Sequence, residues 1–494
     1  MKKLNILLVN PPTLNCMGFL KSFRIQEVPL SLAYIAAVLE KNGHVVSIID
    51  MNVINSHHDF LSKAKEKDYE LIGLTATTPI INNCLRTIKI LKKLHPRARI
   101  VLGGWHATAM PVETMKICRD LDIIVKGEGE ATIKELVEAL TNQRSLHDLQ
   151  GILYRNEAGD IVENPDRPLI EDIDSIPFPA RHLLPIEDYQ KMGVSFITYD
   201  ASSLQYDKSK GYPNVTHMLT SRGCYNRCTF CADHIIYKQK IRFHSPEHVV
   251  AEIKDAISRF NIRIFNILDP VFLLNQNRIR AICKLIIKEK LSIQWCCQGR
   301  VAEKVSFETL DLMRRAGCEK IYYGIESGSP RVLKAINKNI TIKQIRDTIA
   351  NTKKAGIPSH VFFLYGFPGE TMDDYYYTRQ LINEVKPNSI EVHEVIPLPG
   401  TDLFASELAA NNLDTSSWDR YHYYTQKSFH AKKMTKQQLA VRKKFFSLSK
   451  QFNISPHYFF GFIRKIKTLE YFFAIVKGFR MFIEYHVFIK RLLP

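Results

Sequence analysis

The stretch that decides the fold is residues 221–231, Ser-Arg-Gly-Cys-Tyr-Asn-Arg-Cys-Thr-Phe-Cys. Its cysteines, Cys224, Cys228 and Cys231, follow the spacing C-x3-C-x2-C, in which each short loop can turn its sulfur toward one common inorganic centre. A cluster of four irons needs four ligands, so three protein thiolates leave one iron open to a ligand that is not protein. The spacing therefore predicts a [4Fe-4S] cluster with one open coordination position.

Two alternatives remain for these cysteines. A structural zinc site is closed by a fourth Cys or His, usually in a second CxxC-like pair. The chain has no such pair, and His234 is the residue that would have to close the site. Three buried structural thiols are the other alternative, which the polar neighbours Arg222, Asn226 and Arg227 disfavour.

The composition is that of a globular protein with two or three domains. The chain has 494 residues, 45% of them apolar. It contains no run of about 18 uncharged apolar residues, so we expect no membrane-spanning helix. Residues 1–3 lead directly into an apolar strand, so we expect no signal peptide. Ten cysteines without regular pairing then indicate reduced thiols, which predicts a cytoplasmic protein.

Residues 1–141 alternate short apolar stretches with helical patterns. The expected strands are residues 4–9, 44–50, 70–76, 99–103 and 122–126, and the expected helices include 30–41, 80–94 and 130–140. Short runs rich in Val, Ile and Leu are typical of parallel strands buried on both faces. The alternation predicts a Rossmann-like, doubly wound parallel sheet, on which ligands bind at the carboxyl ends of the strands.

The loops at these strand ends carry the candidate ligand-binding residues of the first domain. Glycines there let the backbone approach a ligand closely, and threonine hydroxyls can donate to it. The candidates are Asn10, Pro11, Thr75, Thr77, Gly103, Gly104, Trp105, His106, Gly127 and Glu128. The sequence has no G-x-G-x-x-G after the first strand and no G-x-x-x-x-G-K-[ST], which disfavours nicotinamide and ATP.

Residues 142–212 are expected to be a connector without chemistry of its own. Residues 151–162 suggest a small hairpin, and the proline-rich residues 176–181 suggest a rigid extended link.

Residues 213–410 return to alternating strands and helices. The expected strands are residues 217–221, 263–268, 292–297, 320–325, 359–365 and 389–396, and the expected helices include 246–260, 277–289 and 306–316. Six such units predict a partial (β/α)6 barrel, whose chemistry lies at the carboxyl ends of the strands. The candidates in and around those ends are Phe230, Gln298, Arg300, Glu326, Ser327, Gly366 and Pro397.

The cluster stretch resembles the cluster loop of radical S-adenosylmethionine enzymes, in which C-x3-C-x-aromatic-C follows a strand and a Ser-Arg-Gly turn. The first domain is similar to the cobalamin-binding domain that precedes this motif in one large branch of the family. The similar motifs are Asn-Pro-Pro at residues 10–12, Gly-Gly-Trp-His at 103–106 and Gly-Glu-Gly-Glu at 127–130. Counted over both halves, the resemblance covers roughly residues 1–410.

The resemblance implies the cofactors and the reaction. The open iron would chelate S-adenosylmethionine, and an electron from a donor such as flavodoxin or ferredoxin would split it to a 5′-deoxyadenosyl radical. Barrel loops would contact S-adenosylmethionine, with Glu326 and Ser327 suited to ribose hydroxyls or an ammonium group. Arg300, like Asp269 at the second strand end, is equally explained by an ordinary barrel ion pair. Cobalamin would deliver a methyl group to an unactivated carbon of the substrate.

Two other functions stay open within this resemblance. The first is a cyclase or rearrangement enzyme without net methyl transfer, and the second is a sensor that binds the cofactors without turnover. The substrate is a small molecule or a lipid-like molecule.

One departure from other cobalamin proteins concerns the cobalt. The motif D-x-H-x-x-G is absent from the chain, so bound cobalt should lack the usual histidine ligand. His106 is the strand-end histidine that would have to substitute, and packing within its own loop is the plainer alternative. Trp105 is expected either in the core or against the corrin.

The helical C-terminal region, residues 411–494, holds most of the charge. Residues 431–494 contain 14 Lys plus Arg and 2 Glu, which leaves +12 of the net +18, with many interleaved aromatics. A basic, aromatic, amphipathic helix is typical of contact with an anionic membrane surface, here the inner face. A helical cap on the barrel is the alternative, and nucleic acid is not expected because no RNA-binding motif accompanies the aromatics.

Overall fold

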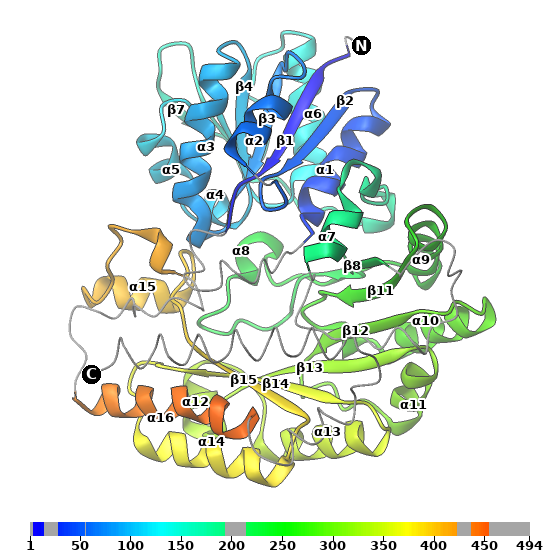
Figure 1. The fold of residues 1–494 in the computed structure, drawn as a ribbon. Coiled ribbons are helices and arrows are strands. Elements are labelled where there is room, and N and C mark those ends of the chain that lie inside the picture. Colours follow the sequence, from blue (N-terminus) through cyan, green and yellow to red (C-terminus); the bar gives the residue numbers. More distant parts are fainter. Residues whose placement is uncertain (1–2, 14–27, 55, 193–213, 422–435, 454–494) are drawn as a thin grey trace.

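The computed structural model describes residues 3–13, 28–54, 56–192, 214–421 and 436–453 (Figure 1). Two α/β units lie one above the other in this view, the N-terminal unit in blue and cyan and the second unit in green and yellow. Each is built on its own sheet, and the connector runs between them.

The N-terminal sheet has seven strands in the order β2-β1-β3-β4-β5-β6-β7. They are β1 (Asn5–Asn10), β2 (Val45–Asp50), β3 (Leu71–Thr75), β4 (Arg99–Gly103), β5 (Ile123–Val125), β6 (Ile152–Arg155) and β7 (Ile161–Glu163). The first five pair in parallel, as predicted. The hairpin β6–β7, expected in the connector, pairs antiparallel with β5 and so continues this sheet.

Helices cover both faces of the N-terminal sheet. One face packs on α1 (Leu30–Lys41) and α6 (Gly129–Thr141), and the other packs on α2 (His57–Ala64), α3 (Ile81–Leu94), α4 (Trp105–Ala109) and α5 (Pro111–Ile117). Successive residues of β1 point to opposite faces of the sheet. Ile6 and Leu8 pack in the core with α1 and α6, and Leu7 and Val9 pack in the core with α2, α3, α4 and α5. The doubly wound architecture is confirmed.

The second sheet has six parallel strands in the order β15-β14-β13-β12-β11-β8. They are β8 (Asn214–Met218), β11 (Ile262–Ile267), β12 (Gln294–Gly299), β13 (Cys318–Glu326), β14 (Ser359–Tyr365) and β15 (Ser389–Glu394). The outer core lies between this sheet and α9 (Pro246–Phe260), α10 (Gln276–Lys288), α11 (Phe307–Arg315), α13 (Ile342–Lys354) and α14 (Met372–Val385). The partial barrel is confirmed.

The first barrel strand ends three residues earlier than the sequence predicts. β8 stops at Met218, and the two-residue strands β9 (Ser221–Arg222) and β10 (Arg242–Phe243) then pair antiparallel. The cause is Asp269, fully buried, which accepts hydrogen bonds from Thr220 N (2.6 Å), Thr220 Oγ1 (2.5 Å) and Ser221 Oγ (2.7 Å). These bonds turn the chain away from the sheet and place the cluster stretch beyond the strand end.

The connector is anchored by buried polar contacts to both units. It contains η3 (Ile173–Ser175), η4 (Arg181–Leu183) and α7 (Ile186–Met192). In α7, the Tyr189 hydroxyl donates to Asp50 Oδ2 of the first unit (2.8 Å). In η4, Arg181 Nη2 pairs with Glu252 Oε1 of α9 (2.6 Å), with both side chains at most 1% exposed.

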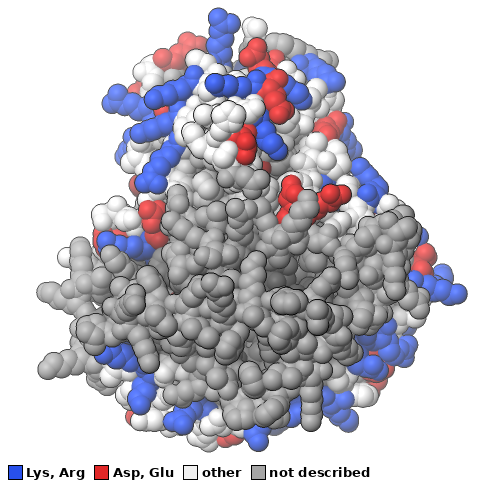
Figure 2. Space-filling model, viewed as in Figure 1, with Lys and Arg blue, Asp and Glu red and all other residues white. Residues whose placement is uncertain are grey.

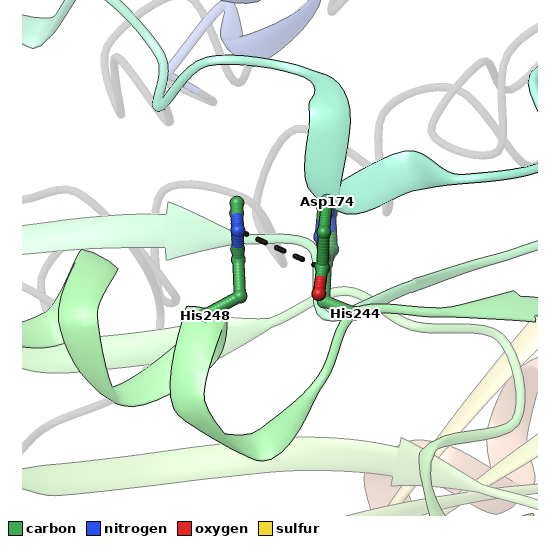
Figure 3. A group of neighbouring side chains, drawn as sticks. All are labelled: Asp174, His244 and His248. Carbon is green, nitrogen blue, oxygen red and sulfur yellow. Dashed lines mark hydrogen bonds and ion pairs between the residues drawn. The ribbon is translucent and has the colours of Figure 1, made fainter.

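A second polar link joins the connector to α9 (Figure 3). Asp174 Oδ1 lies 2.8 Å from His244 Nδ1 and 3.6 Å from His248 Nδ1, and burial lowers the pKa of His244 to about 4. The two imidazole rings are stacked at 4.3 Å and 12°. The trio thus links the connector to the start of α9 through one carboxylate oxygen.

Of the C-terminal region, the structure describes residues 411–421 and α16 (Lys436–Asn453), and α16 packs on the barrel. Phe445 stacks on Tyr365 of β14 at 5.4 Å, and Arg442 pairs with Glu394 of β15 at 3.1 Å. For this helix the cap alternative holds. The rest of the basic tail, residues 431–435 and 454–494, lies outside the described residues.

Among the helices that the structure describes, none is both long and apolar enough to span a bilayer. Figure 2 shows Lys and Arg interspersed with Asp and Glu over the N-terminal unit.

Candidate active site

The three cysteines of the cluster stretch lie beyond the strand ends of the barrel with free thiols. Cys228 is buried, Cys224 and Cys231 are half-buried, and the backbone N–H of Cys231 donates to the carbonyl of Cys228 (3.1 Å). The stretch follows β9 and ends at α8 (Asp233–Tyr237). It is therefore a short loop that places all three thiols beyond the strand ends.

A segment from the other side of the barrel braces this loop. Residues 336–339 follow α12 (Pro330–Ala335), the short helix after β13. Asn226 Nδ2 donates to Asn337 O (2.9 Å) and to Cys228 Sγ (3.0 Å), and Thr229 N donates to Ile336 O (3.1 Å). The loop is thereby held against the carboxyl ends of the central strands.

The turn before the first cysteine has no room for a side chain. Gly223 has φ +89°, and a Cβ built on it would lie 2.1 Å from the carbonyl oxygen of Lys240. Only glycine fits there without moving the backbone that carries Cys224.

Gly223→Ala is therefore expected to weaken the cluster site. Gly43→Ala is the matched control, because Gly43 has φ +86° with no atom within 4 Å of its built Cβ. The control should cost about 1 kcal/mol of stability and leave iron content unchanged, while Gly223→Ala should reduce iron and sulfide per chain after reconstitution. Equal iron content in the two variants would contradict this account of the turn.

An ion pair that the sequence did not predict lies beside the loop. Glu326, at the end of β13 with φ +70°, pairs with Lys338 Nζ at 2.7 Å, and both side chains are buried. Burial alone would lower the pKa of Lys338, but the Glu326 carboxylate and the Cys228 sulfur raise it, so the ammonium stays charged. The run Asn337-Lys338-Asn339 indicates only the tight loop, because both asparagines adopt the left-handed conformation, and nothing local to Lys338 indicates its partner.

Arg300 lies between this segment and the cluster stretch. Its Nη2 donates to Lys338 O (2.5 Å), and its guanidinium stands 5.0 Å from the ring centre of Tyr225. Burial raises the pKa of the Cys224 thiol, and Arg300 partly offsets that rise. Arg300 thus puts positive charge where a thiolate has to form.

The chemistry of the donor set fits an iron–sulfur cluster. Burial raises the pKa of Cys231 to about 12, so its thiolate needs a strong cationic partner such as ligated iron. Among the described residues, the one trio of metal-ligating side chains whose donor atoms all lie within 4.8 Å is Asp174, His244 and His248. The three cysteines do not form such a trio in this structure.

The remaining barrel candidates occupy neighbouring strand-end loops. Phe230 packs on Phe367 at 5.6 Å, and Ser327 Oγ accepts from Ser329 N at 3.1 Å. Gly366 N donates to Glu370 Oε2 at 2.6 Å. Gln298 is half-buried near the end of β12, and Pro397 is buried in the loop after β15.

The strand ends of the N-terminal unit face the cluster stretch. Trp105, at the start of α4, meets the ring of Tyr237 in α8 edge to face at 6.1 Å. Thr77 is exposed, Thr75 and Gly103 are half-buried, and a Cβ on Gly127 would meet no atom within 4 Å. Polar and backbone groups at this edge are thus available to a ligand, as a cobalamin site requires.

Other predicted residues of this unit are occupied by protein contacts. Asn10 Nδ2 donates to Asp50 Oδ1 at 3.0 Å, and Pro11 O accepts from Asn52 Nδ2 at 3.1 Å. At Gly104 there is no room for a side chain, because a Cβ added there would lie 2.7 Å from Thr75 Oγ1.

His106 is buried against the loop after β3 and against a segment that follows the barrel. It is 2% exposed, its Nδ1 lies 3.2 Å from Thr78 Oγ1, and its ring meets Trp418 of η8 (Trp418–Arg420) edge to face at 5.2 Å. Burial lowers its pKa to about 4, so the ring is neutral at pH 7. His106 is thus packed within the protein, as the plainer alternative expects, but its side-chain partners come from other segments than its own loop.

Glu128 lies in the interface between the two units. Its carboxylate pairs with Arg222 and Arg242, which flank the cluster stretch on β9 and β10. Because both carboxylate oxygens are engaged, we leave Glu128 out of the residues proposed to contact a cofactor.

Two family models match the chain. The Radical SAM superfamily matches residues 218–382, and the B12 binding domain matches residues 20–137. An uncharacterized methyltransferase of Pyrococcus horikoshii is 34% identical over 85% of this chain and 87% of its own length. An anaerobic magnesium-protoporphyrin IX monomethyl ester cyclase of Rubrivivax gelatinosus is 28% identical over 80% of this chain and 69% of its own length.

A solved structure has the same fold. The radical S-adenosylmethionine methyltransferase TsrM from Kitasatospora setae, determined with cobalamin and a [4Fe-4S] cluster bound, aligns with a TM-score of 0.68 at 18% identity. The alignment covers 84% of this chain and 80% of that one. The matches confirm the cofactors expected from the sequence, a [4Fe-4S] cluster, S-adenosylmethionine and cobalamin. The chain belongs to the cobalamin-binding radical S-adenosylmethionine enzymes.

Proposed function

We propose that this enzyme methylates an unactivated carbon of a small-molecule substrate. The observation that carries the proposal is the placement of the cluster stretch against the strand ends of the N-terminal unit, through Trp105 and Tyr237. When bound, the cluster and S-adenosylmethionine supply a radical and cobalamin supplies a methyl group. Two cofactors that act on one carbon have to lie close together, and this contact brings their two expected sites next to each other.

The chain's own residues would hold the cofactors as follows. Cys224, Cys228 and Cys231 would ligate the cluster, and Glu326, which pairs with Lys338 at 2.7 Å, would accept from hydroxyl or ammonium groups of S-adenosylmethionine. Other contacts to S-adenosylmethionine are proposed for Phe230, Gln298, Arg300, Ser327, Gly366 and Pro397. Contacts to cobalamin are proposed for Asn10, Pro11, Thr75, Thr77, Gly103, Gly104, Trp105 and Gly127. His106 is proposed to pack the protein at this edge rather than to contact cobalamin.

The inner face of the barrel supports a substrate with polar groups on a flat apolar body. Along β13, β14 and β15, every second residue packs on the outer helices, and the residues between them lie on the inner face. The inner residues include Tyr322, His360, Phe362, Glu391 and His393. The rings of Tyr322 and Phe362 stack at 5.9 Å, and His393 Nε2 lies 2.7 Å from Glu391 Oε1. Stacked rings suit an apolar body, and the Glu–His pair suits hydrogen-bonding groups.

Cyclisation or rearrangement without net methyl transfer is the second candidate, because one relative is named as a cyclase. The relatives are named as enzymes, so a sensor without turnover is not retained.

Incubation with methyl-labelled S-adenosylmethionine separates the two candidates. We expect label in the product, with 5′-deoxyadenosine and S-adenosylhomocysteine formed together. A product without label, with 5′-deoxyadenosine as the sole nucleoside, would replace methyl transfer by rearrangement.

A further inference from the structure

Four buried charged residues join the two units next to the cluster stretch. Arg222 Nη1 lies 2.9 Å from Glu128 Oε1, Arg222 Nη2 lies 2.5 Å from Glu130 Oε1, and Arg242 Nη1 lies 2.6 Å from Glu128 Oε2. Glu128 and Glu130 lie at the start of α6 in the N-terminal unit, whereas both arginines belong to the barrel unit. We call these four residues the interdomain ion network.

The network is shielded from solvent and electrically balanced. Its side chains are between 4% and 10% exposed, and its two positive and two negative charges cancel. Burial alone would raise the pKa of Glu130, but Arg222 holds it below the usual range, so the carboxylate is ionised. In such surroundings, removing one partner leaves an uncompensated buried charge.

The network also includes the connector. Ile170 N donates to Glu128 Oε2 (3.0 Å), and Arg242 Nη1 donates to Ile170 O (2.7 Å). On the other side, the guanidinium of Arg222 stands 5.5 Å from the ring centre of Tyr34 in α1. Both units and the connector therefore converge on the same two arginines.

Arg222 is two residues from the first cluster ligand, with the sterically locked Gly223 between them. Because the backbone at Gly223 is packed against the carbonyl of Lys240, it has little freedom to move, so a shift of Arg222 would also shift Cys224. The partner of Arg222 is the loop after β5, one of the strand ends proposed to hold cobalamin.

We propose that the interdomain ion network is a positioning device that fixes the separation between the bound cluster and the bound cobalamin. The proposal rests on the two-cofactor function above. A radical formed at one cofactor and a methyl group held at the other need a fixed mutual distance, because an error of about 1 Å in such placements costs rate. The network fixes that distance through a buried contact that neither cofactor makes.

The test compares Glu128→Gln with Glu135→Gln. Glu135 lies on the same helix, α6, and pairs with Arg167, but 48% of its side chain is exposed, so its loss removes a carboxylate without leaving a buried charge. Full-length proteins are reconstituted with iron, sulfide and cobalamin and then reduced. Two readouts need no substrate: the relaxation enhancement of the cob(II)alamin electron spin by the reduced cluster, and hydrogen exchange in residues 123–137 and 221–243.

For Glu128→Gln we expect weaker spin coupling and exchange in both segments faster by about a hundredfold, with iron and cobalamin content retained. The control should match the wild type. A Glu128→Gln protein that matches the control in spin coupling would overturn the proposal. A network that only stabilised the fold would speed exchange and leave the spin coupling of folded molecules unchanged.

If Glu128→Gln does not fold, Arg242→Lys takes its place. Arg242→Lys keeps the positive charge but loses one of the two hydrogen bonds that Arg242 Nη1 makes, to Glu128 Oε2 and to Ile170 O. We expect partly weakened spin coupling between the cluster and cob(II)alamin, and unchanged spin coupling would again overturn the proposal. Failure of the proposed function is separately visible, since wild-type protein that bound no cluster or no cobalamin would show no coupling at all.

Discussion

Replacing Cys228 by alanine is expected to abolish the iron–sulfur cluster and, with it, cleavage of S-adenosylmethionine. Cys228 is the most buried of the three ligands, and its sulfur accepts a hydrogen bond from Asn226. With two thiolates left, two of the four irons would lack a protein ligand, which a stable [4Fe-4S] cluster does not tolerate. Iron and sulfide per chain and the visible absorption should fall to background, and 5′-deoxyadenosine should not form.

Cys283→Ala is the control for this substitution. Cys283 lies on α10, fully buried in the outer core of the barrel and away from the cluster stretch. Its replacement should cost about 1 kcal/mol of stability through the small cavity and leave the cluster in place. A Cys228→Ala protein with the cluster content of Cys283→Ala would show that the thiol at 228 is not a ligand.

Replacing Arg181 by methionine is expected to destabilise the protein by about 3–5 kcal/mol, because it leaves the Glu252 carboxylate buried without its partner. Arg181 comes from the connector and Glu252 from α9, so the loss should loosen the connector from the barrel. The measurement is urea unfolding of the protein without cofactors, followed by a barrel tryptophan such as Trp295, which is 2% exposed.

The double variant Arg181→Met, Glu252→Leu identifies the cause. Removing both charges replaces the ion pair with apolar packing, which should recover most of the loss. Arg346→Met is the surface control: it breaks the pair with Glu384, whose side chains are 52% and 35% exposed, and should cost less than about 1 kcal/mol. A double variant no more stable than Arg181→Met would rule out the buried charge as the cause.

The sequence was sufficient to predict the fold because its signals are local. The strand and helix patterns of both units, the cysteine spacing and the turn at Gly223 depend on residues close together in the chain. α9, for example, was expected at residues 246–260 and spans Pro246–Phe260. Patterns of this kind are set by periodicity and turn chemistry, which the sequence displays directly.

Contacts between distant residues were not predictable in the same way. Glu128 was expected at a ligand because it lies in a glycine-rich loop at a strand end, yet it meets an arginine 94 residues away, and Glu130 meets the same arginine. Arg181 and Lys338 drew no prediction at all. A charged residue becomes buried only when its partner arrives by tertiary packing, and no local pattern displays that partner.

The cobalamin edge shows the same limit. The sequence placed His106 at the end of a strand, which is correct, but could not tell whether its ring faced a ligand or Thr78. The deciding neighbour, Trp418, is more than 300 residues away.

The measurement that tests the central claim most directly is anaerobic reconstitution with iron, sulfide and cobalamin, then reduction with S-adenosylmethionine and quantification of 5′-deoxyadenosine and S-adenosylhomocysteine. We predict that the wild-type protein forms both nucleosides and that Cys228→Ala forms no 5′-deoxyadenosine. Wild-type protein that holds the cluster, cobalamin and S-adenosylmethionine, yet releases neither nucleoside in the presence of its substrate, would contradict the account.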